Sequence, residues 1–426
     1  MSRAERRHRR YRKACVGLAT AGLLALPATG ALARPPQPAP RPTASAEPSP
    51  AAGFPTLDDA TAAKLDRAVQ DVLRKTGVPG VVVGISAPGK GTYTRAFGVA
   101  DKATKQPMAT DVYSRIGSET KTFTVTALLQ LAQQGKVDLD DSIGTYVKGV
   151  PNGDKVTLRE LAGMRSGLLS YTATETFYKA LTTDPTRHFT PRELLDYAFK
   201  APKPEILAPN TRFNYSNTNL ILLGLVVEKQ SGLPLPAYIR DHILRPAGMN
   251  RTSFPDDASF PTPHAQGYTR QTASARTQNA TDWNPSWGWA AGAMISDLHD
   301  LRIWAKTLAT GVFPDGTRMV VPDLQKQRLD TRPTGIPGAD YGLGIFDVQG
   351  WIGHNGSLPG YESLTVYLPG QQATLVVLLN TDIPYGPRQE EPSTVFGQAL
   401  TGILTPDHVY NLPAAVQKDM TPSPTG

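Results

Sequence analysis

The chain has 426 residues, a net charge of +7 and a single cysteine, Cys15. Six units of that charge come from residues 1–33, which contain seven Lys or Arg and one Asp or Glu, so the remainder is close to neutral. The composition therefore argues against a nucleic-acid-binding protein, and it excludes disulfides and cysteine metal ligands after residue 33.

Residues 1–33 have the features of a secretory signal. A basic stretch, "RRHRRYRK", precedes the short apolar run "ACVGLATAGLLALPATGALA", which ends in small residues. We expect export to the cell-wall region or medium, by the general or the twin-arginine route. We expect no membrane anchor, because no later segment is long and apolar enough to span a bilayer. Residues 34–55 are rich in Pro and Ala and predict an extended linker.

The folded domain is predicted over residues 56–405. Residues 56–75 have helical spacing, and "GVVVGISA" and "TYTRAFGVA" around "PGKG" predict a hairpin. Residues 118–310 read mostly as helix or loop, with a polar surface excursion at 255–285. Next come the strand-like "GWIGH", "ESLTVYLP" and "ATLVVLLNT", then the helical "STVFGQALTGIL". We predict an α/β fold, with an antiparallel sheet from both chain ends, flanking helices, an inserted helical lobe and a loose tail at 406–426.

One serine precedes a lysine by three positions at the start of an apolar helical run, "RIGSETKTFTVTALLQLAQQGK" (115–136). Ser118 and Lys121 would lie about 60° apart on one helical face, within side-chain reach. Ser118 could instead cap the helix, and Lys121 could be an ordinary solvated lysine. A lysine in the first turn is opposed by the helix dipole, however, and the chain has no other Ser-x-x-Lys.

Two further short motifs occur once each. Tyr215-Ser216-Asn217 stands before an apolar helical run, and His354-Asn355-Gly356 stands at a strand end. Taken singly, each has an ordinary structural explanation: Asn217 as a helix cap, Tyr215 as a half-buried aromatic residue, and His354 as a histidine beside a glycine turn. Their order along the chain, after Ser-x-x-Lys, favours a common catalytic site.

The three motifs resemble those of the penicillin-recognising serine hydrolases, in the Tyr-x-Asn and His-x-Gly variant of D-alanyl-D-alanine carboxypeptidases and class C-like β-lactamases. The resemblance extends over roughly residues 65–400, through "GKVDLDDSIGTYV", "VTLRELAGMRSGL", "SWGWAAGAMIS" and "YGLGI". It implies the β-lactamase/DD-peptidase-like fold. No Gly-x-Ser-x-Gly occurs, which argues against an α/β-hydrolase.

The resemblance also implies roles for the motif residues. Ser118 would be the nucleophile, Lys121 its base, and Tyr215 a second base that carries the proton to the leaving amine. His354 would hydrogen-bond near Tyr215 and polarise it.

Substrate contacts are implied as well. Asn217 would hold the substrate amide, and Asn355, Gly356 and Ser357 would line the substrate strand. The backbone N–H groups of Ser118 and Ser357 would form the oxyanion hole. Trp287 would either line the cleft or serve only in packing.

The expected function is acyl-enzyme hydrolysis of peptidoglycan stem peptides ending in D-Ala-D-Ala, with β-lactams as covalent ligands. We expect no metal, no organic cofactor, no nucleic-acid partner and a monomer. An esterase or a β-lactamase of the same fold, or a penicillin-binding sensor that does not turn over, would share the same acylation residues.

The sequence departs from the carboxypeptidase pattern at one point. Those enzymes have a basic residue soon after "YGLG" and a hydroxyl inside His-x-Gly, both directed to the terminal carboxylate of the peptide. Here the corresponding residues are Ile345-Phe346-Asp347 and Asn355. Unless Arg302, Lys326 or Arg332 supplies the missing cation, we expect substrates with a neutral leaving side to be tolerated.

Overall fold

The computed structural model describes residues 53–413. The predicted signal, most of the linker and residues 414–426 lie outside the described residues. The central element is an eight-stranded sheet in the order β2-β1-β12-β11-β10-β9-β8-β7, in which every neighbouring pair is antiparallel. Its strands are β1 (Gly80–Ala87), β2 (Gly91–Gly98), β7 (Arg332–Ile336), β8 (Ala339–Tyr341), β9 (Phe346–Val348), β10 (Trp351–Leu358), β11 (Tyr361–Leu368) and β12 (Ala373–Leu379).

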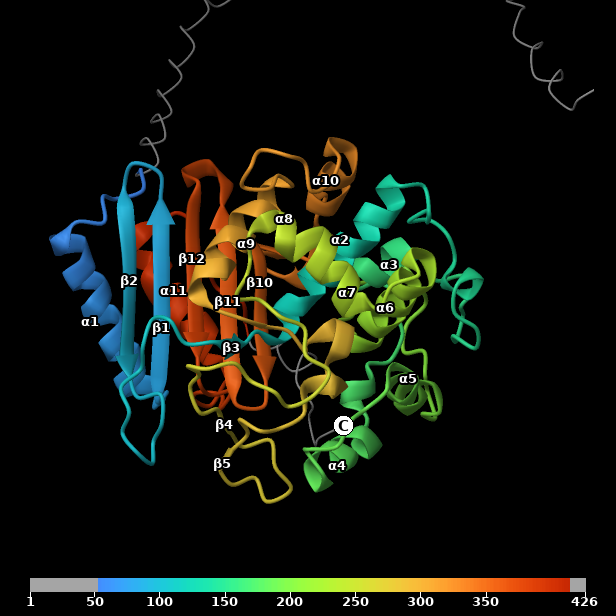
Figure 1. Ribbon diagram of the computed structural model, residues 1–426, viewed down its shortest axis with the longest axis horizontal. Coiled ribbons are helices and arrows are strands. Elements are labelled where there is room, and N and C mark those ends of the chain that lie inside the picture. The colour runs from blue at the N-terminus through green and yellow to red at the C-terminus, as the bar shows by residue number, and fades with distance from the viewer. Residues whose placement is uncertain (1–52, 414–426) are drawn as a thin grey trace, which may run out of the picture. The chain divides into compact units, whose positions relative to one another are not determined.

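The middle of the sheet is buried on both faces. Every residue of β11 and β12 is buried, whereas edge strand β2 is mostly exposed or half-buried. Helices α1 (Asp59–Thr76) and α11 (Pro392–Leu404) pack together on one face, and α9 (Leu298–Thr310) covers β10, β11 and β12 on the other (Figure 1). Because helices cover both faces, these strands read as continuous apolar runs rather than as alternating patterns.

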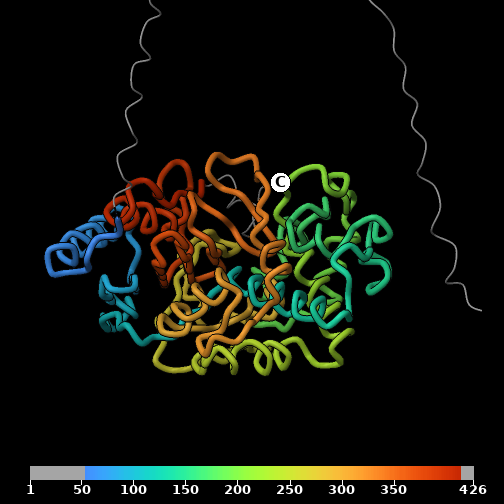
Figure 2. Tube along the Cα trace, turned by 90° about the horizontal axis from the view of Figure 1, so that it is seen from above, coloured from blue at the N-terminus to red at the C-terminus, as the bar shows by residue number. Residues whose placement is uncertain are grey.

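Apart from α1, α11 and the short turn Pro369–Gln371, the helices lie between β2 and β7 in the sequence, and Figure 2 shows the green part of the chain beside the orange and red part. The α-helices are α2 (Thr120–Gln133), α3 (Leu158–Ala162), α4 (Glu175–Thr183), α5 (Pro191–Phe199), α6 (Asn217–Ser231), α7 (Leu235–Ile239), α8 (Arg245–Ala247) and α10 (Pro322–Leu329). Short helical turns are η1 (Gly117–Glu119), η2 (Ile143–Thr145), η3 (Tyr171–Ala173), η4 (Arg240–Leu244), η5 (Pro285–Trp287), η6 (Trp289–Ala291) and η7 (Pro369–Gln371). The predicted fold, a sheet from both chain ends with an inserted helical lobe, is confirmed.

Seven short strands were not predicted from the sequence. Strands β7, β8 and β9 extend the sheet beyond β10, and the helical region contains two small ribbons. These ribbons are β3 (Ser114–Arg115) with β6 (Ile295–Ser296), and β4 (Tyr268–Thr269) with β5 (Gln278–Asn279). All seven strands have five residues or fewer, so their apolar period is too short to detect.

The predicted domain boundaries need correction at both ends. Phe54, assigned to the linker, is 2% exposed, and its backbone N–H donates to the side chain of Gln371. Tyr410 and Leu412, assigned to a loose tail, are also buried. The backbone N–H of Tyr410 donates to Thr401 of α11, so residues 406–413 belong to the packed domain. Isolated apolar residues in a Pro-rich context gave no periodic signal for this packing.

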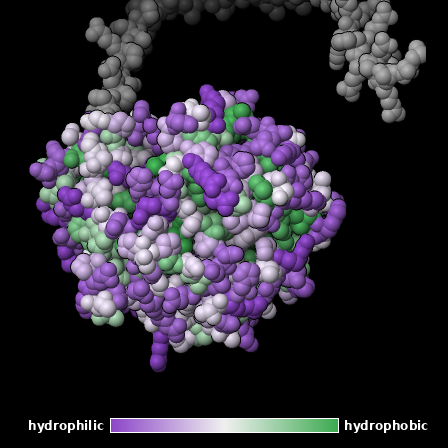
Figure 3. All heavy atoms as spheres, viewed as in Figure 1, coloured by the Kyte–Doolittle hydropathy of each residue, from purple (hydrophilic) through white to green (hydrophobic). Residues whose placement is uncertain are grey.

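The surface is predominantly polar. Among the described residues, Leu233 is the one large hydrophobic residue classed as exposed, and Figure 3 shows hydrophobic residues scattered over the visible face. No single helix of residues 53–413 has the length and apolarity needed to cross a bilayer, although α6 and the following segment Leu235–Ala247 would meet that criterion together as a pair bent by 75°.

Candidate active site

Ser118 lies in the short turn η1, directly before helix α2. The Lys121 Nζ is 2.8 Å from the Ser118 Oγ and 2.7 Å from the carbonyl oxygen of Ala291. Ser118 is not the cap of α2: Glu119 occupies that position, and it makes no side-chain capping bond. The serine and the lysine therefore form a hydrogen-bonded pair, rather than a cap and a solvated charge.

The environment of Lys121 favours its uncharged form. The side chain is completely buried, and this desolvation lowers the pKa of Lys121 well below its usual value. The centroid of the Tyr215 ring lies 5.0 Å from the Lys121 Nζ. A neutral amine here can donate to the Ala291 carbonyl while its lone pair accepts the Ser118 proton, which is the arrangement a general base requires.

Tyr215 lies in the loop that leads into α6, and its hydroxyl is buried beside the serine. Burial raises the pKa of Tyr215 well above its usual value, and an interaction with Ser118 only partly opposes that effect. The hydroxyl makes no hydrogen bond of good geometry with the described residues. Tyr215 is therefore a neutral phenol, suited to pass a proton to a leaving group rather than to take the first one.

His354 belongs to strand β10, and its side chain lies on the face of the sheet that is turned towards Tyr215. Its Nε2 lies 3.3 Å from the hydroxyl of Tyr341, and its Nδ1 lies 2.5 Å from the carbonyl oxygen of Asn355. The rings of His354 and Tyr215 stand 6.2 Å apart, centroid to centroid. His354 thus lies beside the ring of Tyr215, as predicted, while its hydrogen bond is with the hydroxyl of Tyr341. Burial is the main cause that lowers the pKa of His354 to about 3, and a positive charge on Lys121 would act in the same direction.

Glycines bring the serine turn and β10 together. Gly117 has a φ of +50°, and a Cβ there would lie 2.8 Å from the backbone nitrogen of Ser357. A Cβ on Gly356 would meet the carbonyl oxygen of Ile116 at 1.9 Å. Only glycine permits this approach, which places the start of the serine turn against the backbone of Ser357. The two predicted oxyanion donors thus belong to adjacent backbone segments.

Asn217 is the first residue of α6, and Ser216 is the cap. The side-chain amide of Asn217 donates to Thr172 Oγ1 at 3.0 Å, and its backbone N–H donates to Ser170 Oγ at 3.1 Å. These bonds fix the side chain between α6 and the turn η3. Within residues 53–413 its amide oxygen accepts no hydrogen bond, so this oxygen can accept one from a substrate N–H.

Two predicted substrate-binding residues have other surroundings. Asn355 Nδ2 donates to Glu391 Oε2 at 2.8 Å, so its side chain is used at the start of α11 and not beside Ser118. Successive side chains of a strand point to opposite faces, and His354 uses the catalytic face. Trp287 packs at 6.0 Å from the ring of Phe177. Its carbonyl accepts a bond from Tyr171, which favours the packing alternative.

The sequence analysis missed an aromatic wall beside His354. The centroid of the Phe346 ring lies 5.0 Å from that of His354 and 4.6 Å from that of Tyr341, and Phe213 lies 5.3 Å from Tyr341. Phe346 is the second residue after "YGLG". The sequence comparison indicates only that this stretch lacks a basic residue, and not that the ring of Phe346 lies beside His354. Tyr341 begins the "YGLGI" stretch, but neither it nor Phe213 was connected with His354, because this contact depends on the tertiary fold.

A second missed residue is Glu119, next to the nucleophile. Its side chain is 1% exposed, and burial raises its pKa to about 8 although Ser363 and Thr365 of β11 lie close enough to oppose that effect. No ion pair to Glu119 occurs within residues 53–413. A carboxyl group buried in this way is held in its protonated form over most of the neutral range.

One described cluster has the side chains for a metal ion, Asp297 with His299 and Asp300. Its oxygens already have partners. Asp297 pairs with Arg251 and caps α9 by accepting from the backbone of Asp300, while Asp300 accepts from the backbone of Arg251 and from Thr252. The cluster stabilises the start of α9, and its contacts give no indication of a metal.

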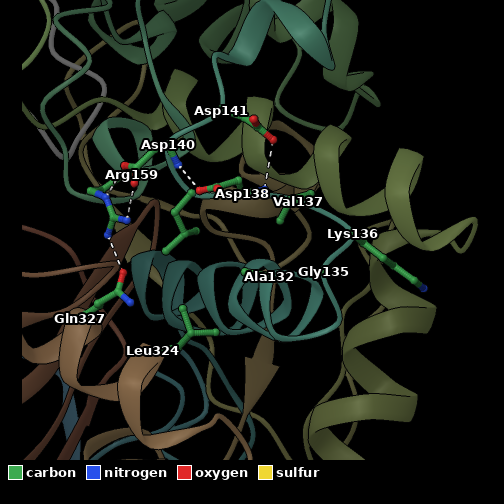
Figure 4. Close-up of a pocket in the computed structure, with 11 residues that line it drawn as sticks. Ala132, Gly135, Lys136, Val137, Asp138, Asp140, Asp141, Arg159, Leu324 and Gln327 are labelled. Carbon is green, nitrogen blue, oxygen red and sulfur yellow. Dashed lines mark hydrogen bonds and ion pairs between the residues drawn. The ribbon is translucent and has the colours of Figure 1, made fainter. Parts of the chain in front are cut away.

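The carboxylates of the acidic loop "VDLDDS" (137–142) are likewise engaged in contacts within the protein. The loop borders a cavity of about 600 Å³, shown in Figure 4. Asp140 pairs with Arg159, Asp138 accepts from the backbone of Asp140, and Asp141 accepts from the backbone of Asp138. Its carboxylates hold the loop after α2 in place.

A serine hydrogen-bonded to a buried lysine, a neutral tyrosine beside them and a strand that closes on the serine turn define a serine hydrolase of the acyl-enzyme class. The Beta-lactamase family model matches residues 65–399. The chain belongs to this family.

Individual relatives agree with this assignment. A D-stereospecific amidohydrolase from Streptomyces sp. is 30% identical, with a TM-score of 0.66 over 76% of this chain and 94% of the other. The octameric penicillin-binding protein homologue from Pyrococcus abyssi is 27% identical, with a TM-score of 0.68 over 83% and 79%. Because that relative is octameric, the expectation of a monomer is not supported.

The chain also matches Protein flp of Staphylococcus aureus strain MW2, with 28% identity over 340 residues. The match covers 77% of this chain and 65% of that protein, so the chain spans less than two thirds of the relative's length.

Proposed function

We propose that this protein is an exported serine amidohydrolase that transfers the acyl part of D-configured peptides to Ser118, with stem peptides ending in D-Ala-D-Ala as the expected substrate class. The proposal includes a relaxed leaving-group specificity: amides and esters that leave a neutral product are accepted beside peptides with a free carboxylate. Export rests on residues 1–33, and the D-configuration on the motifs and on the D-stereospecific amidohydrolase relative.

The observation that carries the relaxed specificity is the aromatic wall beside His354. Phe346 lies in the stretch after "YGLG" where the resemblance implies a basic residue, and its ring centroid lies 5.0 Å from that of His354. The predicted replacements have other positions: Arg302 donates to Thr94, Arg332 donates to Asn210, and Lys326 is exposed on α10. A hydrogen bond to a charged group contributes about 1.5–3 kcal/mol, which corresponds to roughly 10- to 150-fold in selectivity.

The reaction proceeds in two halves. The Ser118 Oγ attacks the substrate carbonyl carbon while Lys121 Nζ takes its proton, and the resulting oxyanion faces the N–H groups of Ser118 and Ser357. The C–N bond then breaks as Tyr215 passes a proton to the leaving nitrogen, recovering one from Lys121. In the second half, water attacks the ester on Ser118, and the acid product leaves with the serine restored.

The test compares kcat/KM for a D-Ala-D-Ala peptide with that for its C-terminal amide. The proposal predicts values within about tenfold of each other, because no cation is expected to bind the terminal carboxylate of the free acid. A preference of a hundredfold or more for the free acid would overturn the relaxed specificity. Hydrolysis of the matching L-configured peptides at equal rates would overturn the assigned substrate class.

Turnover separates hydrolysis from a binding role. If a fluorescent penicillin labels Ser118 stably while neither peptide nor a chromogenic ester is hydrolysed, the protein is a penicillin-binding sensor and the proposed hydrolysis is wrong. Rapid loss of the penicillin label with release of hydrolysed antibiotic would instead identify a β-lactamase.

A further inference from the structure

We propose a second, non-catalytic site on the outer side of α9, which binds a small amphiphilic anion: one phosphate or carboxylate group attached to a short apolar chain. The site is a cavity of about 720 Å³ between the exposed side of α9 and the segment that follows it, residues 312–316. Figure 1 shows α9 on the near side of the sheet.

The charged side chains that line this groove are positive. Arg302 and Lys306 lie one turn apart on α9 and both line the cavity, which has no acidic residue in its lining. Within residues 53–413 neither side chain makes an ion pair. Among the same residues, the side chain of Arg302 makes one hydrogen bond, 3.2 Å from its Nη1 to Thr94 Oγ1. Two cations without a counter-ion at one concave surface are suited to an anionic group.

The acids nearest to the groove in the sequence are already engaged. Asp300 lies on the buried side of α9, where His299 Nδ1 lies 3.1 Å from its carboxylate. Asp315 accepts bonds from the backbone and the hydroxyl of Thr317. Neither carboxylate lines the cavity. The ligand would therefore meet Arg302 and Lys306 without a competing carboxylate in the lining.

Much of the remaining lining is apolar, beside the polar side chains of His299, Thr307 and Thr310. The apolar residues are Ile303 of α9 and Val312, Phe313 and Pro314 of the segment that follows it. The volume lies within the roughly 300–1,000 Å³ typical of small-molecule sites, which are also mostly apolar with a few polar groups that fix orientation. A bare inorganic anion would leave this surface unused, and a neutral chain would leave the cations unpaired. The combination selects an acid group with an attached chain.

The groove is distinct from the catalytic site. On the opposite side of the same helix, the Trp304 ring stacks on Phe123 of α2 at 4.0 Å, and its Nε1 donates to Thr122 at 2.8 Å. Helix α9 thus separates the groove from the helix that carries Lys121, and no residue of the serine–lysine pair lines the cavity. The inference does not depend on the proposed substrate.

The test is a calorimetric titration of the whole protein with octyl phosphate, inorganic phosphate and neutral octyl glucoside, all below micelle formation. We expect octyl phosphate to bind at least tenfold more tightly than either of the other two probes. Equal binding of octyl glucoside would show an apolar pocket without anion recognition, and equal binding of inorganic phosphate would show an ion site without a chain. Either result overturns the proposal.

Variants locate the site. Lys306→Gln should weaken octyl phosphate about fivefold, whereas Lys326→Gln, an exposed lysine on α10 outside the groove, should leave it unchanged. Arg302→Gln should weaken it about tenfold, and Arg302→Lys should restore most of the loss. Melting curves check that each variant is folded. Equal losses for Lys306→Gln and Lys326→Gln, or no loss for any variant, would contradict the assignment to α9.

Discussion

At the scale of single residues, burial decides which groups of the site carry protons. The same desolvation lowers the pKa of Lys121, raises that of Tyr215 and lowers that of His354 to about 3. Each shift favours the neutral form, so the resting site holds an amine, a phenol and an imidazole without charge. An uncharged base beside a serine and an uncharged acid beside the leaving group are what acyl transfer requires.

Replacing the lysine tests its role as the base. Lys121→Ala should lower the rate of acylation by about 10² to 10⁴-fold, because proton removal from Ser118 then depends on water. In the wild type, acylation should rise with pH as Lys121 loses its proton at its lowered pKa, and the variant should lose this limb. Stopped-flow acylation between pH 5 and 10 measures both effects. An unchanged pH limb in the variant would assign the titration to another group.

Tyr215→Phe tests the proton delivery to the leaving group. The variant keeps the ring beside Lys121 and loses only the hydroxyl. It should slow amide hydrolysis far more than hydrolysis of an ester with a good leaving group, which needs no protonation. Parallel kcat/KM measurements on both substrates provide the comparison. Equal losses for the two substrates would indicate that the hydroxyl positions Ser118 instead.

At the scale of elements, the turn η1 joins the catalytic helix to the sheet. Gly117→Ala places a Cβ 2.8 Å from the Ser357 nitrogen, at a φ that side chains rarely adopt. Since the loss of one oxyanion donor costs about 10² to 10³ in kcat, we predict a fall of about 10²-fold with a small change in KM. Steady-state kinetics and a melting curve check this. Full activity in the variant would show that the two segments can separate freely.

Glu119, packed between this turn and β11, should make stability depend on pH. Its folded pKa of about 8 exceeds the ordinary value of 4.5, so the folded state binds more protons than the unfolded state between these values. The contribution is present below pH 4.5 and is lost as the pH rises to about 8.

Glu119→Gln should remove this dependence. We predict that the variant melts higher than the wild type at pH 8.5 by a margin that shrinks towards pH 5. One pKa unit corresponds to about 1.4 kcal/mol, so the difference in the free energy of unfolding between the variant and the wild type at pH 8.5 should exceed about 1 kcal/mol. Other groups cancel in the difference between the two proteins. A margin that stays constant from pH 5 to 8.5 would show that Glu119 is ionised in the folded state.

How far the sequence could predict these elements depended on their length and regularity. The hairpin β1–β2, strands β10 to β12 and helix α11 were expected, because each has a long apolar or alternating pattern. Ser118, Lys121, Tyr215 and His354 were found through motifs. The partner of His354 was not, because Tyr341 lies in a three-residue strand whose position depends on pairing with β9. Contacts set by tertiary pairing leave no local signal.

At the scale of the whole molecule, the site lies where the inserted helical lobe meets the sheet. The lobe supplies Ser118, Lys121, Tyr215 and Asn217, and the sheet supplies His354 and Ser357. The chain ends therefore have to pair before the site exists: β1 pairs with β12, Val81 opposite Leu379, across nearly the whole domain. Helix α9 packs on the sheet and, through Trp304, on α2, so the groove on its outer side lies apart from the catalytic residues.

The central claim is that Ser118 becomes covalently acylated, and one measurement tests it most directly. The protein is incubated with a penicillin, and intact mass followed by peptide mapping locates any adduct. We predict an adduct of the mass of one antibiotic on the peptide that contains Ser118, and none on the Ser118→Ala variant, which should keep its fold because Ser118 does not cap α2. An adduct on another residue, or equal labelling of Ser118→Ala, would contradict the account.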